Sequence, residues 1–161
     1  IRGDDNFDTA FAKSVAIIAD VKAYNVNGGS SSATTWHTRD LNTELDDPEN
    51  IVTIASNQFT LQAGTYLIEW SAPAYATDRS PTRLQNITDS TTDSEGTSAY
   101  NGVDATTISI GAKVITLTSA KSFEIQHYTT VAVATVGLGV SSNVSGQNSV
   151  FTLVKIHKIG A

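Results

Sequence analysis

The feature that most constrains the fold is a regular alternation of side chains after residue 64. The polar positions include Thr65, Glu69 and Ser71. The apolar residues fill every second position between them: Tyr66, Ile68, Trp70 and Ala72. A period of two places one set of side chains on one side of an extended strand. The segment therefore predicts a β-strand with one face on a hydrophobic core.

Similar short runs recur along the chain, separated by turn-forming residues. They cover residues 14–26, 35–43, 51–54, 58–61, 77–88, 105–118, 122–130 and 149–159. No window has a helical period, and about eight to ten short strands with turns between them are typical of a sandwich or jelly roll. With 161 residues, the sequence predicts one all-β domain, an antiparallel β-sandwich.

One run, ATTISIGAKVITLT, changes its apolar parity partway along. Ile108 and Ile110 occupy even positions, whereas Ile115 and Leu117 occupy odd ones. One extra residue would produce such a slip, so we expect a β-bulge around Gly111 to Val114.

Composition excludes several classes of partner. The formal charge is −6 and the ten Lys and Arg residues are scattered, so no basic footprint for nucleic acid is present. No apolar run approaches the roughly 18 residues of a membrane-spanning helix. We therefore expect neither a nucleic-acid partner nor membrane insertion.

No pattern of metal ligands or catalytic groups stands out. His37, His127 and His157 lie on three separate predicted strands, so a zinc site would require a threefold axis to gather copies of one of them. The acidic runs ELDDPEN and DSTTDSEG lack the spacing of a calcium loop. Strand-borne Glu69 and Glu124 have no recognisable catalytic surroundings. We expect no metal, no cofactor and no enzymatic activity.

The first and last predicted strands break the in-and-out alternation. The run 15–19 is apolar at every position, and Phe151 and Leu153 lie on the opposite face from Val154 and Ile156. A strand that is apolar on both faces is covered on both faces. In a single domain without helices, the second cover is another copy of the protein. The alternative is a register bulge inside a monomeric core.

Three segments resemble a known fold family. FTLQAGTYLIEWSAP resembles a strand pair of complement-type globular heads and of tumour necrosis factor-like jelly rolls. AKVITLTSAKSFEIQHY resembles their next-to-last hairpin, and NSVFTLVKIHKI resembles their closing strand. The resemblance implies a jelly roll over most of the chain.

A more specific resemblance involves TWHTRDLNTEL, SNQFTLQAGTYLIEWSAPAY, DRSPTRLQNITDST and FEIQHYTT. These segments look like a module at the C-terminal ends of bacteriophage and related viral fibre proteins. That family implies a homotrimer at a fibre tip, with the first and last strands in the sheet around the threefold axis. The residues we accordingly expect at the trimer interface are Ile17, Tyr66, Ile68, Phe151, Val154 and Ile156.

The resemblance implies a division into two parts and a receptor site. Residues 1–13 would be a linker from an upstream fibre shaft, and residues 14–161 the receptor-binding tip. Among the predicted loops, Tyr100, Asp93 and Asn101 could bond or stack a sugar. The expected partners are further copies of the chain and a host cell-surface glycan or outer-membrane receptor.

Three alternatives stay open at this point. The chain could be the tip of a bacterial trimeric adhesive fibre at a cell surface instead of on a virion. It could be a structural domain that keeps fibre chains in register without binding a receptor. It could also hydrolyse a surface glycan, because jelly-roll enzymes exist.

Overall fold

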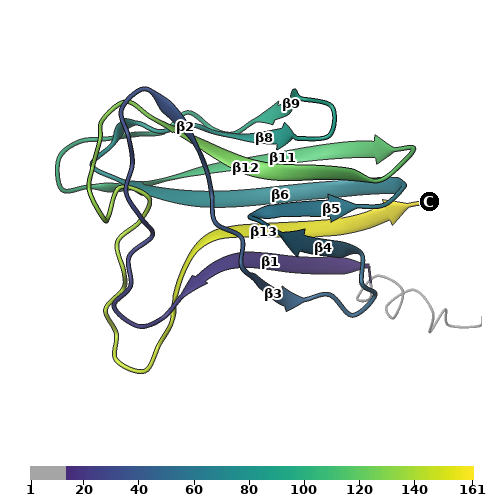
Figure 1. Ribbon diagram of the computed structural model, residues 1–161, viewed down its shortest axis with the longest axis horizontal. Helices are drawn as coiled ribbons and strands as arrows, with labels where there is room; N and C mark the ends of the chain where they lie inside the picture. Colours follow the sequence, from purple (N-terminus) through teal and green to yellow (C-terminus); the bar gives the residue numbers. More distant parts are fainter. Residues whose placement is uncertain (1–13) are drawn as a thin grey trace, which may run out of the picture.

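The computed structural model describes residues 14–161, and the predicted linker, 1–13, lies outside them. The described residues form strands and loops (Figure 1), with no helix long and apolar enough to cross a membrane. The strands are β1 Val15–Lys22, β2 Thr35–Thr38, β3 Thr43–Asp46, β4 Val52–Ala55, β5 Gln58–Leu61, β6 Gly64–Tyr75, β7 Asp78–Arg79, β8 Thr82–Asn86, β9 Thr91–Glu95, β10 Tyr100–Asn101, β11 Thr106–Leu117, β12 Lys121–Thr129 and β13 Ser149–Gly160.

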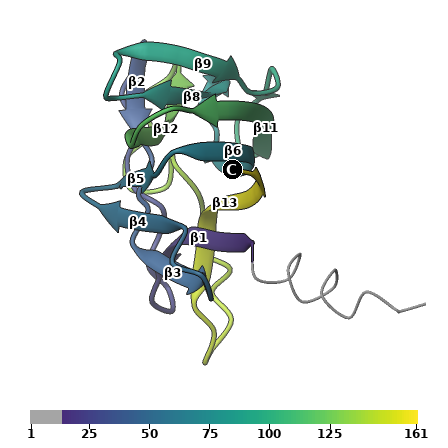
Figure 2. The ribbon, with the colours of Figure 1, turned by 90° about the vertical axis from the view of Figure 1, so that its right-hand side faces the viewer.

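Two antiparallel sheets stack as a sandwich, seen along the strands in Figure 2. The five-stranded sheet has the order β11-β6-β13-β1-β3. The six-stranded sheet has the order β4-β5-β12-β8-β9, with β2 paired to β12. The prediction of an antiparallel β-sandwich is confirmed.

The chain crosses between the layers at two of the predicted turns. β5 and β6 belong to different sheets, and the turn between them ends at Gly64, whose φ of 151° suits a residue without a Cβ. β11 and β12 also belong to different sheets. The predicted hairpin between β11 and β12 is therefore wrong, because the chain passes from one layer to the other between these two strands.

Alternate residues of the facing strands fill the interior. Every second residue of β6 is buried, beginning with Gly64, so the alternation read from the sequence is confirmed. From the other layer, Phe59 and Phe123 stack at 5.6 Å between ring centroids. The core cluster comprises Ala16, Ile18, Leu41, Val52, Phe59, Leu61, Tyr66, Ile68, Trp70, Leu84, Leu117, Phe123, Ile125, Val154 and Ile156. Burial of each large side chain contributes roughly 1.5–3 kcal/mol.

The bulge predicted in β11 is absent. β11 pairs with β6 in one continuous register from Thr106 to Leu117. Ile115 points inward against the core, whereas Ile108 and Ile110 are exposed on the opposite face. The change of apolar parity therefore reflects a strand with apolar residues on both faces, not a slip of register.

A bulge does occur in β13, where it pairs with β1. The register shifts between Ala19 and Val21, so that Asp20 of β1 lies opposite two residues of β13, Phe151 and Thr152. Asp20 is buried, and its Oδ1 accepts a hydrogen bond from Asn42 Nδ2 at 3.2 Å and forms an ion pair with Lys22 Nζ at 3.1 Å. The alternative of a register bulge thus applies to the start of β13, whereas Val15 to Ala19 of β1 pair with β13 without a shift.

The long loops gather at one end of the sandwich. In Figure 1, β1 begins and β13 ends on the right, whereas the connections 23–34 and 130–148 lie on the left. These two connections bond each other, for example through Gly28 N to Gly139 O at 2.9 Å. Arg39 fixes them to the sheet, because its buried guanidinium donates to Leu138 O at 2.7 Å and to Thr152 Oγ1 at 2.8 Å.

Candidate functional site

The outward face of the five-stranded sheet is apolar and exposed. Ile108, Ile110 and Val114 of β11 are 57%, 52% and 57% exposed. Cross-strand pairing aligns them with outward residues of β6 and β13, since Ile110 lies opposite Ser71 and Ser71 opposite Leu153. We call this surface the apolar outer face. It comprises Val15, Ile17, Leu67, Ser71, Ile108, Ile110, Val114 and Leu153.

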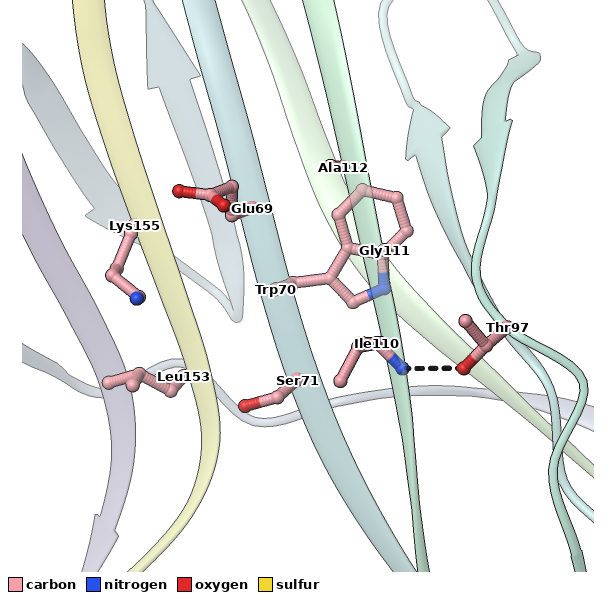
Figure 3. Close-up of a pocket in the computed structure, with 9 residues that line it drawn as sticks. All are labelled: Glu69, Trp70, Ser71, Thr97, Ile110, Gly111, Ala112, Leu153 and Lys155. Carbon is pink, nitrogen blue, oxygen red and sulfur yellow. Dashed lines mark hydrogen bonds between the residues drawn. The ribbon is translucent and has the colours of Figure 1, made fainter.

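A small polar group interrupts the apolar outer face. Glu69 and Lys155 are cross-strand neighbours, and His157 Nε2 lies 3.6 Å from Glu69 Oε2. Figure 3 shows Glu69 and Lys155 beside each other at a shallow depression of about 480 Å³, whose floor includes the strand at Gly111.

Four of the residues predicted at a trimer interface are instead in the core. The side chains of Tyr66, Ile68, Val154 and Ile156 are each at most 1% exposed and pack between the two sheets. They cannot contact another subunit, so this part of the prediction is wrong. The pattern revealed that both faces of these strands carry apolar residues, but it did not identify which parity faces the core.

The other two predicted interface residues differ from each other. Phe151 is buried against the loop at Gly139, where an added Cβ would lie 2.3 Å from the Phe151 ring. It therefore serves packing within the chain. Ile17 alone of the six projects from the apolar outer face, opposite Lys155, and is half-buried.

The three residues predicted to bind a receptor differ in how accessible their side chains are. Asn101 is 3% exposed, with Oδ1 accepting from Thr77 N and Nδ2 donating to Ala74 O, both at 2.8 Å. Asp93 accepts from Thr91 Oγ1 at 2.7 Å and from an asparagine amide at 3.2 Å. Tyr100, in contrast, is 67% exposed. Asn101 is a structural residue, Asp93 is engaged in its own turn, and Tyr100 is accessible.

Tyr100 borders a cavity that the sequence reading missed. The cavity measures about 450 Å³ and is lined by Arg79, Pro81, Ser98, Ala99 and Tyr100. Tyr100 pairs directly with Arg79 across the β10-β7 ladder. The sequence did contain a signal for this cavity. In DRSPTR, the residues Arg79, Pro81 and Arg83 occupy every second position, so they lie on one side of the strand, the side that faces solvent.

An aromatic pair adjoins this cavity. Tyr128 N donates to Pro81 O at 2.9 Å, and the Tyr128 ring meets the Trp36 ring edge-on at 5.3 Å. The Arg83 guanidinium lies over Trp36, with Cζ 4.1 Å from the ring centroid. We call this surface the aromatic strip. It comprises Trp36, Arg79, Pro81, Arg83, Tyr100 and Tyr128.

The histidines do not form a metal site in the described part of the chain. His127 is fully buried, with Nε2 bonded to Ser80 O at 2.8 Å. Burial, with the nearby Arg39 charge, lowers the pKa of His127 to about 3. Its side chain therefore cannot reach a subunit axis. Among residues 14–161 no three His, Asp or Glu side chains are grouped so that they could hold a metal ion.

The acidic runs are occupied by local contacts. Asp47 caps the start of β4 by accepting from Ile51 N at 2.9 Å and Val52 N at 3.0 Å. Asp89 lies 2.6 Å from Lys121 Nζ, and this hydrogen bond lowers the pKa of the Asp89 carboxyl. These carboxylates support turns and strand ends.

No protein-family model matches the chain, and no curated protein sequence does either. Among solved structures, the globular domain of zebrafish complement 1qA protein is similar at 14% identity and a TM-score of 0.57, covering 91% of this chain and 97% of that one. Murine APRIL at pH 5.0 is similar at 12% identity and a TM-score of 0.59, covering 89% and 98%. Murine APRIL at pH 8.5 gives 11%, 0.53, 89% and 98%.

At these identities the likeness concerns the fold. The chain has the tumour necrosis factor-like jelly roll that the complement 1q globular domain and APRIL share, as the resemblance in strand order implied.

Proposed function

We propose that this chain is a non-enzymatic, homotrimeric attachment domain at the tip of a viral fibre, where it binds a surface molecule of the host cell. The observation that carries the proposal is the apolar outer face of the five-stranded sheet. The fibre itself is inferred from the resemblance of TWHTRDLNTEL and the associated segments to viral fibre tips.

The apolar outer face supports self-association. Soluble monomers rarely expose a continuous apolar surface over several strands, and such patches mark interaction sites. Ile108, Ile110 and Val114 lie in one line along β11, beside Leu67 and Leu153 on the neighbouring strands. Covering this area with a copy of the chain contributes about 25 cal/mol per Å² of apolar surface removed from water.

The proposed number of subunits follows from the fold. The sheet that bears the apolar outer face holds the first and last long strands, β1 and β13, side by side. In the jelly-roll family that the sequence resembles, this sheet surrounds a threefold axis. In a closed threefold ring each contact is heterologous, so part of the apolar outer face of one subunit would pack against a different part of its neighbour, and closure leaves no contact surface unpaired.

The loop end supplies the attachment surface. Loops 23–34 and 130–148 lie at the opposite end from the start of β1 and the end of β13. A chain that enters from a shaft at β1 would direct these loops, and Tyr100, away from the shaft. Three linked copies of a weak site raise avidity by about 10²–10⁴.

Sedimentation of the fragment tests the association. We expect a species of three times the 17.0 kDa chain mass at micromolar concentration. Ile110→Lys places a charge on the apolar outer face, at a side chain that is 52% exposed on β11, and should yield a folded monomer. Val103→Lys is the matched control, because Val103 is 88% exposed but lies in a loop outside this face. A wild-type chain that sediments as a folded monomer would overturn the proposal.

Adsorption to host cells tests the attachment. The trimeric fragment should bind susceptible cells and compete with the intact particle for infection. A stable trimer that neither binds cells nor blocks infection would favour a structural domain that keeps fibre chains in register.

A further inference from the structure

The aromatic strip belongs to the outward face of the six-stranded sheet at its loop end. Trp36 of β2 is the cross-strand partner of Tyr128 of β12, and Tyr128 N bonds Pro81 O on the other side. These three residues therefore form one row across three neighbouring segments. The cavity of about 450 Å³ at Pro81 and Tyr100 continues the row.

Two arginines flank this row. Arg79 and Arg83 project to the solvent side, because the intervening Ser80 and Thr82 are buried. Arg79 lies toward Tyr100, its ladder partner, and Arg83 lies over the Trp36 ring. An aromatic row with a cation on each side is unusual on a chain whose net charge is −6.

Arg83 is held in a fixed position by a ladder of side chains. Its Nε donates to Gln126 Oε1 at 2.7 Å, and Gln126 Nε2 in turn donates to Glu124 Oε1. Thr38 Oγ1 donates to the same Glu124 oxygen at 3.0 Å. The terminal nitrogens of Arg83 have no hydrogen bond within residues 14–161 and are not buried, so they stay available to a ligand.

The acidic side chains near Arg79 and Arg83 do not occupy the terminal guanidinium nitrogens of Arg83, where a ligand would bind. Glu124 is 6% exposed, and its Oε1 already accepts two hydrogen bonds. Glu95 is the cross-strand partner of Arg83, but no ion pair joins the two in the described part of the chain. Arg79 contacts Asp78 at 3.2 Å while its side chain stays 70% exposed.

We propose that the aromatic strip binds an oligosaccharide that carries a carboxylate, with a sugar ring on Tyr128 beside the stacked Arg83 and Trp36 and the carboxylate at Arg83. This proposal rests on the attachment function above and names the class of receptor. The C–H face of a pyranose packs against an aromatic ring, whose few rotatable bonds keep the ordering cost low. A guanidinium accepts a carboxylate through two parallel hydrogen bonds.

The shape of the strip favours a saccharide over a protein partner. The polar side chains beside the strip, Gln126 and Glu124, are hydrogen-bonded to Arg83 or to each other and hold the guanidinium in place. The cavity volume lies within the roughly 300–1,000 Å³ of small-ligand sites. Arg79, Pro81 and Tyr100 would surround a second sugar next to the one on Tyr128.

Tryptophan fluorescence tests the proposal directly. The chain has two tryptophans, of which Trp36 is 36% exposed and Trp70 only 3%, so a ligand on the strip should alter the emission of Trp36. The probes are 3′-sialyllactose with lactose as its neutral counterpart, and trigalacturonate with its methyl ester. We expect at least one acidic probe to change the emission and to bind at least tenfold more tightly than its neutral counterpart. No change with either acidic probe, or equal binding of both neutral counterparts, overturns the proposal.

Two variants locate the binding. Arg83→Gln and Tyr128→Ala should each weaken the binding of the acidic probe at least tenfold, and the sedimentation profile should stay unchanged. Thr53→Ala is the matched control, since Thr53 is exposed on β4 of the same sheet, away from the strip. If a variant unfolds, Arg79→Gln serves in its place, because that side chain is 70% exposed. Variants that bind like the wild type overturn the proposal.

Cell adsorption separates this proposal from the attachment function. If the wild type and Arg83→Gln adsorb equally to host cells, attachment stands and the strip is not the receptor site. If no cell is bound but an acidic probe binds in an Arg83-dependent manner, saccharide binding stands and host attachment fails.

Discussion

The indole of Trp70 occupies the space that a side chain at Gly111 would need. The two residues are cross-strand partners on β6 and β11, and a Cβ at Gly111 would lie 2.0 Å from Trp70 Cζ2. The missing side chain lets the indole lie across β11 and donate from Nε1 to Thr82 Oγ1 at 2.8 Å. This contact joins the five-stranded sheet to the start of β8.

Gly111→Ala should therefore destabilise the fold. The methyl group would displace the Trp70 ring and break its bond to Thr82, which costs about 2–3 kcal/mol for an overpacked core position. Urea unfolding measures the change. Gly102→Ala is the control, because nothing lies within 4 Å of a Cβ built there. Equal midpoints for both variants would contradict the contact.

Arg39→Leu should destabilise the loop end of the domain. Its buried guanidinium donates to Thr152 Oγ1, Pro73 O and Leu138 O, and burial lowers the pKa of Arg39 to about 10. Leucine leaves these acceptors unpaired, at roughly 1–3 kcal/mol for each buried group. Hydrogen exchange should detect faster opening of loop 130–148 before global unfolding. Unaltered protection of this loop would be inconsistent with a fastening role.

Asn101→Ala and Tyr100→Ala should separate structure from recognition. The side chain of Asn101 makes two buried hydrogen bonds, with Thr77 N and Ala74 O. Its removal should therefore lower the free energy of unfolding by roughly 2–4 kcal/mol. Tyr100 is 67% exposed, so its replacement should change the free energy of unfolding by at most about 0.5 kcal/mol. Thermal unfolding of both variants measures the two changes in stability. A larger loss for Tyr100→Ala would reverse the assignment.

His127 should make the domain less stable in acid. Its pKa falls to about 3 in the folded chain, against about 6.5 for an exposed histidine. The unfolded chain therefore binds more protons between these values, so stability is full above pH 6.5 and declines as the pH falls toward 3. The expected slope is at most about 1.4 kcal/mol per pH unit.

His127→Gln removes this titration while an amide can still donate to Ser80 O. Urea unfolding at several pH values from 7 to 4 should give a flatter dependence for the variant than for the wild type. Parallel curves for the two proteins would exclude His127 as the source.

The sequence by itself determined the strands of the core. The alternation of Tyr66, Ile68 and Trp70 fixes which side chains of β6 lie together, because the side-chain period of a strand is two. The number of short strands with turns between them indicated a sandwich or jelly roll, and the resemblance of three segments in strand order favoured the jelly roll. The apolar residues on both parities of the first and last strands also predicted a second apolar surface.

Only the tertiary structure decided which face of each strand lies against the core and which faces outward. Parity groups residues into two faces, but the packing of the second sheet determines that Val154 and Ile156 face the core and Ile17 and Ile110 face outward. The burial of Asn101 also depends on a long-range contact, its bond to Ala74 O. The aromatic strip is assembled from residues far apart in the chain, since Trp36 and Tyr128 meet only through strand pairing.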